Sequence, residues 1–163
     1  MVAPVIEFGF KEADRPAIVA LFREYWAAIG LAPTFQNFES EVAGLPGEYA
    51  PPRGQMIVAR DASDGNLVAC VSLRPFPEPG CCEMKRLYVR PVARGTGLGR
   101  RLALAVMDEG RRLGYTRMCL DTLPTLQAAQ ALYLDLGFRH TGMAATDPPT
   151  LLFVCELGDE SGQ

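Results

Sequence analysis

The stretch VRPVARGTGLGRR, residues 89–101, joins the end of a predicted strand to the start of a predicted helix through a glycine-rich turn. Glycines at 95, 97 and 99 let backbone N–H groups converge without interference from Cβ atoms. The positive end of the helix dipole adds to this attraction for anions. The stretch therefore predicts a cradle for a pyrophosphate, although a tight strand-to-helix connection alone would also use such glycines.

Two common phosphate ligands do not fit this stretch. A dinucleotide fingerprint needs a third glycine where Arg100 stands. A magnesium-nucleotide P-loop ends in Lys followed by Ser or Thr, and that ending is missing. A different diphosphate ligand is therefore indicated.

Hydrophobic periodicity and turn residues outline the elements on both sides of this stretch. The predicted strands cover residues 5–10, 55–60, 67–73, 82–89, 117–121 and 151–156. The predicted helices run from an Asp14 cap to about residue 29, from an Asn37 cap to about residue 45, and over 98–113 and 127–136. Helices placed between strands and hairpins imply a mixed α/β or α+β sheet with helices on its faces.

Length and charge limit the class of protein to which this chain can belong. The 163 residues fit one domain over residues 1–157, with residues 158–163 expected as a flexible tail. No apolar run is long enough for a membrane span and no secretory signal is visible, so we expect a cytoplasmic protein with no membrane partner. The net charge of −3 argues against general nucleic-acid binding. Residues 85–112 carry eight basic and two acidic residues, which indicates a local anionic ligand.

The cysteines and the histidine give no metal-binding pattern. The five cysteines include no C-x-x-C pair, and His140 is the only histidine. We therefore expect no metal site, and we expect reduced, buried cysteines.

Three blocks of sequence carry a resemblance to a known family. Arg94-x-x-Gly97-x-Gly99 resembles the acyl-CoA motif of the GCN5-related N-acetyltransferase (GNAT) superfamily. Residues 83–89 (EMKRLYV) look like the fourth strand of that family. Residues 129–138 resemble its later helix and the beginning of the strand that follows.

This resemblance implies a fold and a cofactor. The implied fold is a mixed, largely antiparallel central sheet flanked by helices, with a fourth and fifth strand that splay apart to admit acetyl-CoA. The backbone of Leu87, Tyr88 and Val89 would pair with the pantetheine arm. The diphosphate would be held by the loop and its amides, with the implied contacts at Arg94, Gly95, Thr96, Gly97, Leu98, Gly99 and Arg100. Many relatives have an asparagine at the position of Leu126, so one polar contact with the cofactor is absent or comes from elsewhere.

Two residues are the candidates for acid–base chemistry. Glu83 occupies a strand position where some members of the family place a catalytic glutamate, and it is our candidate base; an exposed carboxylate at a strand start is the alternative. Tyr133 is our candidate acid for the leaving thiolate, because helix spacing puts Leu132 and Leu136 on the core side and leaves the phenol free. The alternative for Tyr133 is a packed tyrosine whose hydroxyl bonds to backbone.

The sequence therefore predicts an N-acetyltransferase that moves an acetyl group from acetyl-CoA directly to a primary amine in a ternary complex. A small-molecule amine is the favoured acceptor. Transfer to a protein lysine or N-terminus and a non-catalytic acyl-CoA-binding module remain as alternatives. The sequence identifies neither the acceptor nor the choice between a monomer and a homodimer.

Overall fold

A computed structural model of the chain describes residues 2–32 and 34–158, so most of the predicted tail lies outside the described residues. Seven strands form one sheet in the order β1-β2-β3-β4-β5-β7-β6. The strands are β1 (Val5–Phe8), β2 (Gln55–Arg60), β3 (Leu67–Pro75), β4 (Cys81–Val89), β5 (Arg117–Thr122), β6 (Arg139–Ala144) and β7 (Thr150–Glu156). The α-helices are α1 (Arg15–Ala28), α2 (Phe38–Ala43), α3 (Leu98–Arg112) and α4 (Gln127–Asp135). Short 3-10 turns are η1 (Glu12–Asp14), η2 (Phe35–Asn37), η3 (Gly47–Tyr49) and η4 (Pro91–Ala93).

The predicted elements are confirmed with small shifts at their ends, but both predicted helix caps are wrong. Asp14 precedes α1 without capping it, because its carboxylate accepts a hydrogen bond from Arg60 at 2.8 Å. Asn37 precedes α2 in a left-handed conformation (φ 56°) and also makes no side-chain cap. Tertiary partners and backbone geometry thus override the local preference of these residues for capping.

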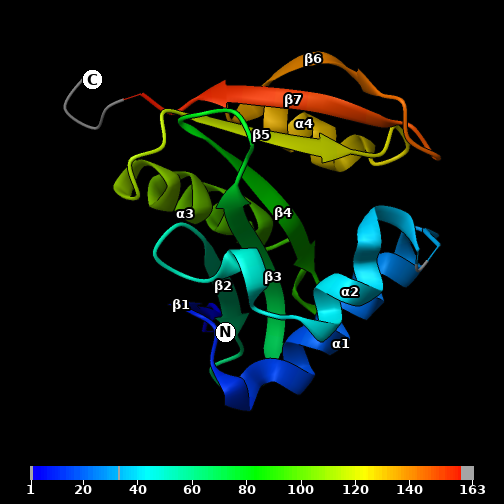
Figure 1. The fold of residues 1–163 in the computed structure, drawn as a ribbon. Coiled ribbons are helices and arrows are strands. Elements are labelled where there is room, and N and C mark those ends of the chain that lie inside the picture. Colours follow the sequence, from blue (N-terminus) through cyan, green and yellow to red (C-terminus); the bar gives the residue numbers. More distant parts are fainter. Residues whose placement is uncertain (1, 33, 159–163) are drawn as a thin grey trace.

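The splayed pair of strands is present. All neighbours in the sheet run antiparallel except β4 and β5, which are parallel. These two strands pair only from Cys81 to Glu83 against Arg117 to Cys119. Beyond Glu83 the two strands diverge, and Figure 1 shows β4 running down toward α1 while β5 stays beside β7. The divergence opens the sheet in its middle, where a ligand can pass between two strands.

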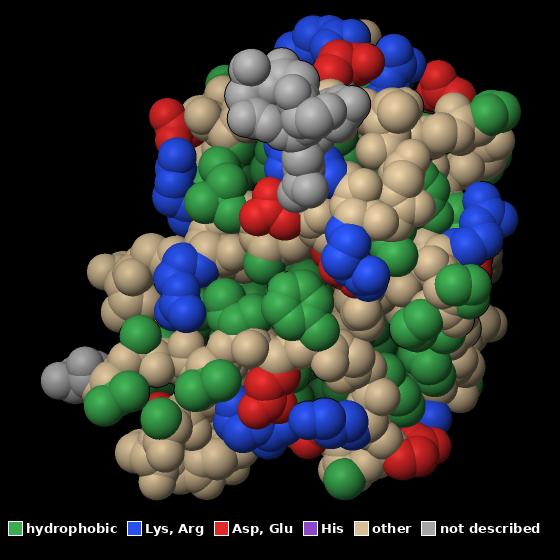
Figure 2. Space-filling model, turned by 90° about the vertical axis from the view of Figure 1, so that its left-hand side faces the viewer, with side chains coloured by type: hydrophobic (Ala, Val, Ile, Leu, Met, Phe, Trp, Pro, Cys, Tyr) green, Lys and Arg blue, Asp and Glu red, His purple; other side chains and the backbone are tan. Residues whose placement is uncertain are grey.

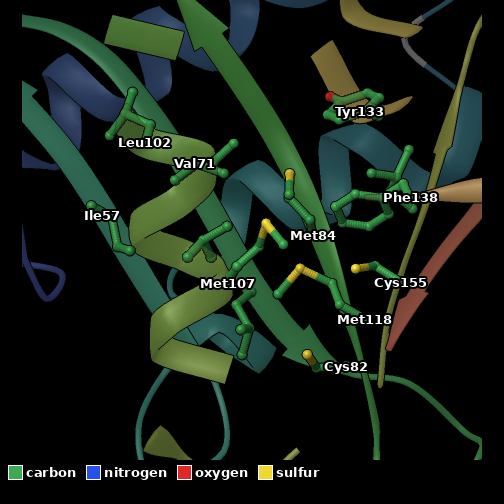
Figure 3. Close-up of a cluster of buried hydrophobic side chains, with 14 of the residues drawn as sticks. Ile57, Val71, Cys82, Met84, Leu102, Met107, Met118, Tyr133, Phe138 and Cys155 are labelled. Carbon is green, nitrogen blue, oxygen red and sulfur yellow. The ribbon is translucent and has the colours of Figure 1, made fainter. Parts of the chain in front are cut away.

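Helices cover both faces of the sheet. Helices α1 and α2 pack on one face, in a cluster that includes Phe22, Trp26 and Phe38. Helix α3 packs on the other face, and beyond β5 the sheet continues into β7 and β6, with α4 beside them (Figure 1). Figure 3 shows Met84, Met107 and Met118 meeting between α3 and strands β4 and β5. Apolar side chains along one side of α3 therefore fix the position of its N-terminus against the sheet.

Strand β4 contains a bulge beside the splay. Cys70 pairs with Tyr88 and Ser72 pairs with Lys85, so two residues of β4, Arg86 and Leu87, stand opposite one residue of β3. Arg86 has a left-handed backbone (φ 61°), which is unusual for a residue with a side chain. The extra residue shifts the alternation of the strand, so that Lys85 and Tyr88 both face α1 and α2.

The described surface shows no large field of one charge on the face in Figure 2. That face, which includes the side of α3, carries Lys and Arg side chains next to Asp and Glu side chains around small hydrophobic groups. Among the described helices, none is long and apolar enough to cross a membrane.

Candidate active site

The glycine-rich loop closes tightly before α3. Gly95 (φ 79°) and Gly97 (φ 80°) are both left-handed, and no atom lies within 4 Å of a Cβ built on either. The Thr96 hydroxyl donates to the Ala93 carbonyl at 2.9 Å and fixes the turn. Leu98 begins the helix and is buried, which holds the loop against the sheet. The amides that follow Arg94 therefore surround an open concavity at a helix N-terminus, the arrangement that binds phosphate groups.

The four arginines of residues 89–101 point in different directions, and Arg90 pairs with Glu24 of α1. Arg94 donates to the Val89 carbonyl at 2.8 Å and lies over the Tyr88 ring, 5.8 Å from its centroid. Arg100 pairs with Asp135 of α4. Arg101 donates to the Pro4 carbonyl at 3.3 Å, on the β1 side. Only Arg94 lines the cavity described next, so its side chain is the one positioned at a ligand.

A cavity of about 590 Å³ runs from this loop into the splay between β4 and β5. We call it the long cavity. Eight of the ten residues predicted to contact the cofactor line it, all except Thr96 and Arg100: Leu87, Tyr88, Val89, Arg94, Gly95, Gly97, Leu98 and Gly99. Its far end is lined by aromatic and apolar side chains of α1 and the segment after it, including Tyr25, Ile29 and Phe35. The long cavity thus spans the sheet from the α3 side to the α1 side.

Tyr133 lines the long cavity from α4. It is the buried residue of α4, whereas Leu132 and Leu136, which helix spacing placed on the core side, are half-buried, and Leu136 packs against the core. The ring packs against Phe138 and Phe153, with centroids 5.8 and 6.3 Å away. Burial, followed by the influence of Tyr25 and Asp121, raises the pKa of the Tyr133 phenol, which stays protonated at neutral pH.

Many relatives have an asparagine at the position of Leu126, and two further side chains of the long cavity show what this chain has instead. Leu126, at that position, lines the cavity with an apolar side chain. Thr150, at the start of β7, also lines the cavity and is 3% exposed; its hydroxyl interacts with the Asp121 carboxylate, and its oxygen accepts no hydrogen bond in the described part of the chain. A hydroxyl oxygen of this kind is available to a donor group of a ligand.

Glu83 does not line the long cavity. It lies at the last position at which β4 pairs with β5. Its side chain lines a second cavity of about 570 Å³ under α2 and η3, which we call the acidic cavity. Arg74 Nε donates to Glu83 Oε1 at 3.0 Å, and Lys85 Nζ lies 3.8 Å from Glu83 Oε2. Tyr133 and Glu83 are therefore separated by the sheet, with the phenol on the side of α4 and the carboxylate on the side of α2.

Three residues that the sequence analysis did not select join the two cavities. Gln36, Lys85 and Asp121 line both. Lys85 Nζ donates to Gln36 Oε1 at 3.0 Å and to Asp121 Oδ1 at 3.3 Å, and Gln36 Nε2 donates to Asp121 Oδ2 at 2.8 Å. Burial favours a raised pKa for Asp121, but the Lys85 ammonium outweighs it, so the pKa is lowered and the carboxylate is ionised. Alternation along β4 places Lys85 on the same side as Glu83, which is a signal that the sequence did contain.

The cysteines and the histidine take no part in this site. Cys119 is half-buried in β5, and burial raises the pKa of its thiol, which disfavours the nucleophilic thiolate. His140 is exposed, and its Nε2 lies 2.9 Å from the Gly142 carbonyl oxygen. In the described ranges, no group of three His, Cys, Asp or Glu side chains is arranged to hold a metal ion.

Comparisons with known proteins agree with this geometry. The model of the acetyltransferase (GNAT) family matches residues 16–138. An uncharacterised N-acetyltransferase of Schizosaccharomyces pombe is 48% identical over 121 residues, which cover 74% of each chain. The uncharacterised N-acetyltransferase YjgM of Escherichia coli is 32% identical over 135 residues, 80% of each chain. The structure of YncA, a putative acetyltransferase of Salmonella typhimurium with acetyl-CoA, superposes with a TM-score of 0.76 at 21% identity, covering 99% of this chain and 98% of that one.

Proposed function

Because this chain belongs to the GNAT acetyltransferase family and is an acyl-CoA-dependent N-acyltransferase, we propose that it moves an acetyl group from acetyl-CoA to a primary amine of a small molecule. The observation that carries this proposal is the meeting of the two cavities at the splay. The long cavity begins at the phosphate loop, and the acidic cavity reaches the same point from under α2. Donor and acceptor can therefore be bound together, which supports direct transfer without an acyl-enzyme.

The residues around the long cavity fit acetyl-CoA, which supplies the acetyl thioester. The amides of the phosphate loop would hold the diphosphate, and the backbone of Leu87 to Val89 would hold the pantetheine arm. The hydroxyl oxygen of Thr150 would accept a hydrogen bond from the pantetheine arm in place of the missing asparagine. The acetyl-CoA in the Salmonella protein supports this choice of donor.

Two side chains would move protons during the transfer. An alkylamine has a pKa of about 10.4, so making it neutral at pH 7 costs roughly 4.6 kcal/mol. Glu83 would accept that proton, directly or through a water. Tyr133 would donate a proton to the leaving thiolate, and the amide near Val89 would polarise the thioester carbonyl. The positions of Glu83 on the acceptor side and Tyr133 on the donor side support these roles.

Calorimetric titration with CoA tests the binding mode. We expect Gly97→Leu to abolish measurable heat, because a side chain at this position narrows the phosphate loop. Gly65→Leu is the matched control, since Gly65 has the same left-handed backbone (φ 78°) and open surroundings but lies in the β2–β3 turn. Equal CoA affinity in both variants, or no CoA binding by the unaltered protein, would refute the proposal. Release of thiol from acetyl-CoA in the presence of amines tests the catalytic step.

A further inference from the structure

The acidic cavity is not needed for acetyl-CoA, and its chemistry limits what the acceptor can be. We propose that it selects acceptors that carry a second cationic group, so that the favoured substrates are linear diamines rather than monoamines or amino acids. This inference rests on the proposed function and specifies its acceptor. It is carried by the charges that line the cavity, by their existing partners and by one buried hydroxyl whose oxygen accepts no hydrogen bond.

Carboxylates outnumber cations around the acidic cavity. Its lining contains four acidic side chains, Glu41, Glu48, Glu83 and Asp121, and two basic ones, Arg74 and Lys85. The pKa of Glu41 is lowered as well as that of Asp121, because the attraction of Arg86 outweighs the effect of burial. Arg86, which pairs with Glu41 from behind the lining, brings the cations to three, so one negative charge remains in excess and the cavity presents a net negative potential to an entering ligand.

The cations beside the acidic cavity already face carboxylates. Arg86 makes a two-pronged pair with Glu41, with both distances at 2.8 Å. Lys85 is 5% exposed and is held by Asp121 and by the amide oxygen of Gln36. An acceptor carboxylate would have to displace one of these partners and would still meet the surplus acidic groups.

Glu48 is the carboxylate best placed to receive a cation. Its side chain is 68% exposed at the rim of the acidic cavity, and its contact with Arg74 is long, with 3.6 Å between Glu48 Oε1 and Arg74 Nη1. An ammonium at the rim would therefore pair with Glu48 without breaking a buried interaction.

Tyr49 supplies the second, independent observation. Its side chain lines the acidic cavity and is 2% exposed; its hydroxyl interacts with the Glu41 carboxylate, and within the described residues its oxygen accepts no hydrogen bond. Burial and the nearby Glu41 carboxylate raise the pKa of this phenol, so it is neutral. A neutral phenol oxygen accepts a hydrogen bond from an ammonium. The cavity thus contains an unused acceptor group as well as surplus negative charge.

A diamine would use the two ends of the site differently. One amine lies at the junction near Asp121, loses its proton to Glu83 and attacks the thioester carbon. The C–N bond forms, the C–S bond breaks, and the leaving thiolate takes the proton of Tyr133. The new amide nitrogen gives its surplus proton through water to the Tyr133 phenolate, and Glu83 releases the proton that it accepted to solvent. The other amine stays protonated in the acidic cavity between Tyr49 and Glu48, and its charge is retained in the product.

A matched set of four-carbon amines tests this selectivity. We expect kcat/KM for 1,4-diaminobutane to exceed that for butylamine by about tenfold or more, with 4-aminobutanoate the poorest, because their second groups are cationic, absent and anionic. The difference shrinks at about 0.5 M salt, since screening weakens exposed pairs. In the presence of saturating CoA, 1,4-diaminobutane also raises the Tm more than butylamine does.

A variant of the rim separates charge selection from catalysis. We expect Glu48→Gln to lower kcat/KM for 1,4-diaminobutane about fivefold and to leave butylamine unchanged, as one exposed ion pair is worth about 1 kcal/mol at most. Glu39→Gln is the control, because Glu39 is an exposed carboxylate of α2 that pairs with Arg23 outside the cavity. Equal use of the diamine and butylamine, a preference for 4-aminobutanoate, or acetylation of amino acids but not of the diamine would overturn the inference. Each of these results leaves the acetyltransferase itself intact, whereas a failure to bind CoA refutes the proposed function.

Discussion

Replacing Tyr133 with phenylalanine removes one hydroxyl from the long cavity and keeps the ring. The ring packs edge-on against Phe138 and near Phe153, and these contacts survive the change. Truncating a buried aromatic side chain to alanine costs about 3–5 kcal/mol, but this variant creates only a hydroxyl-sized gap. We therefore expect the Tm to change by no more than a few degrees.

The effect on catalysis is expected to be much larger. Proton transfer from a positioned side chain contributes about 10²–10⁴-fold to a rate. Water or another group can replace part of this, so we expect kcat to fall at least about tenfold, equivalent to roughly 1.4 kcal/mol in the barrier. Because burial raises the pKa of Tyr133, the phenol keeps its proton up to strongly alkaline pH, and the loss should be similar at every pH from neutral to mildly alkaline.

The assay is thiol release from acetyl-CoA with a saturating amine, together with calorimetric titration of CoA. Tyr115→Phe is the matched control: its hydroxyl donates to the Arg53 carbonyl at 2.6 Å, and it is 8% exposed and lies outside both cavities. We expect normal turnover in the control and unchanged CoA affinity in both variants. Full turnover by Tyr133→Phe would exclude the phenol as the acid.

Three other changes have defined outcomes. Glu83→Gln is expected to shift the pH–rate profile toward higher pH, because the amine must then lose its proton without a base; an unaltered profile would reject Glu83 in that role. Glu41→Gln leaves the buried Arg86 without its carboxylate and should destabilise the fold by about 3–5 kcal/mol in thermal unfolding at pH 7. Since the folded-state pKa of Glu41 is lowered, its contribution exists above about pH 4.3 and is lost as the pH falls through the folded value, so this variant should lose less stability on acidification than the parent does. Gly54→Ala would place a Cβ 2.2 Å from a backbone oxygen of η3, so we expect a displaced Tyr49 and a higher KM for the amine with unchanged CoA affinity.

The donor side of the site could be predicted because its signals are local. Glycines at 95, 97 and 99, at the passage from a strand to a helix, indicate a phosphate loop, and the family resemblance favours this interpretation over a plain tight turn. The periodicity of residues 98–113 places α3 on the sheet, and the family resemblance supplies the splay. Each of these features depends on residues that are close together in the chain.

The acceptor side could not be predicted in the same way. Gln36, Lys85 and Asp121 come from the α1–α2 connection, β4 and β5, and only the folded sheet brings them together. Gln36 has a left-handed backbone (φ 56°), which the residue types around it do not predict. The prediction that the Asp14 side chain caps α1 failed for the same reason, because the carboxylate binds Arg60, which lies in β2.

The extra residue in β4 allows this strand to change length at one place without moving its side chains to the other face. Lys85 and Tyr88 share a face although they are three positions apart, so deleting Arg86 or Leu87 would leave them two positions apart in a regular strand and still on that face. A single deletion elsewhere in β4, where pairing is regular, would exchange the faces of all side chains on one side of it. Homologous strands should therefore differ by one residue only at the bulge, and elsewhere gain or lose residues in pairs.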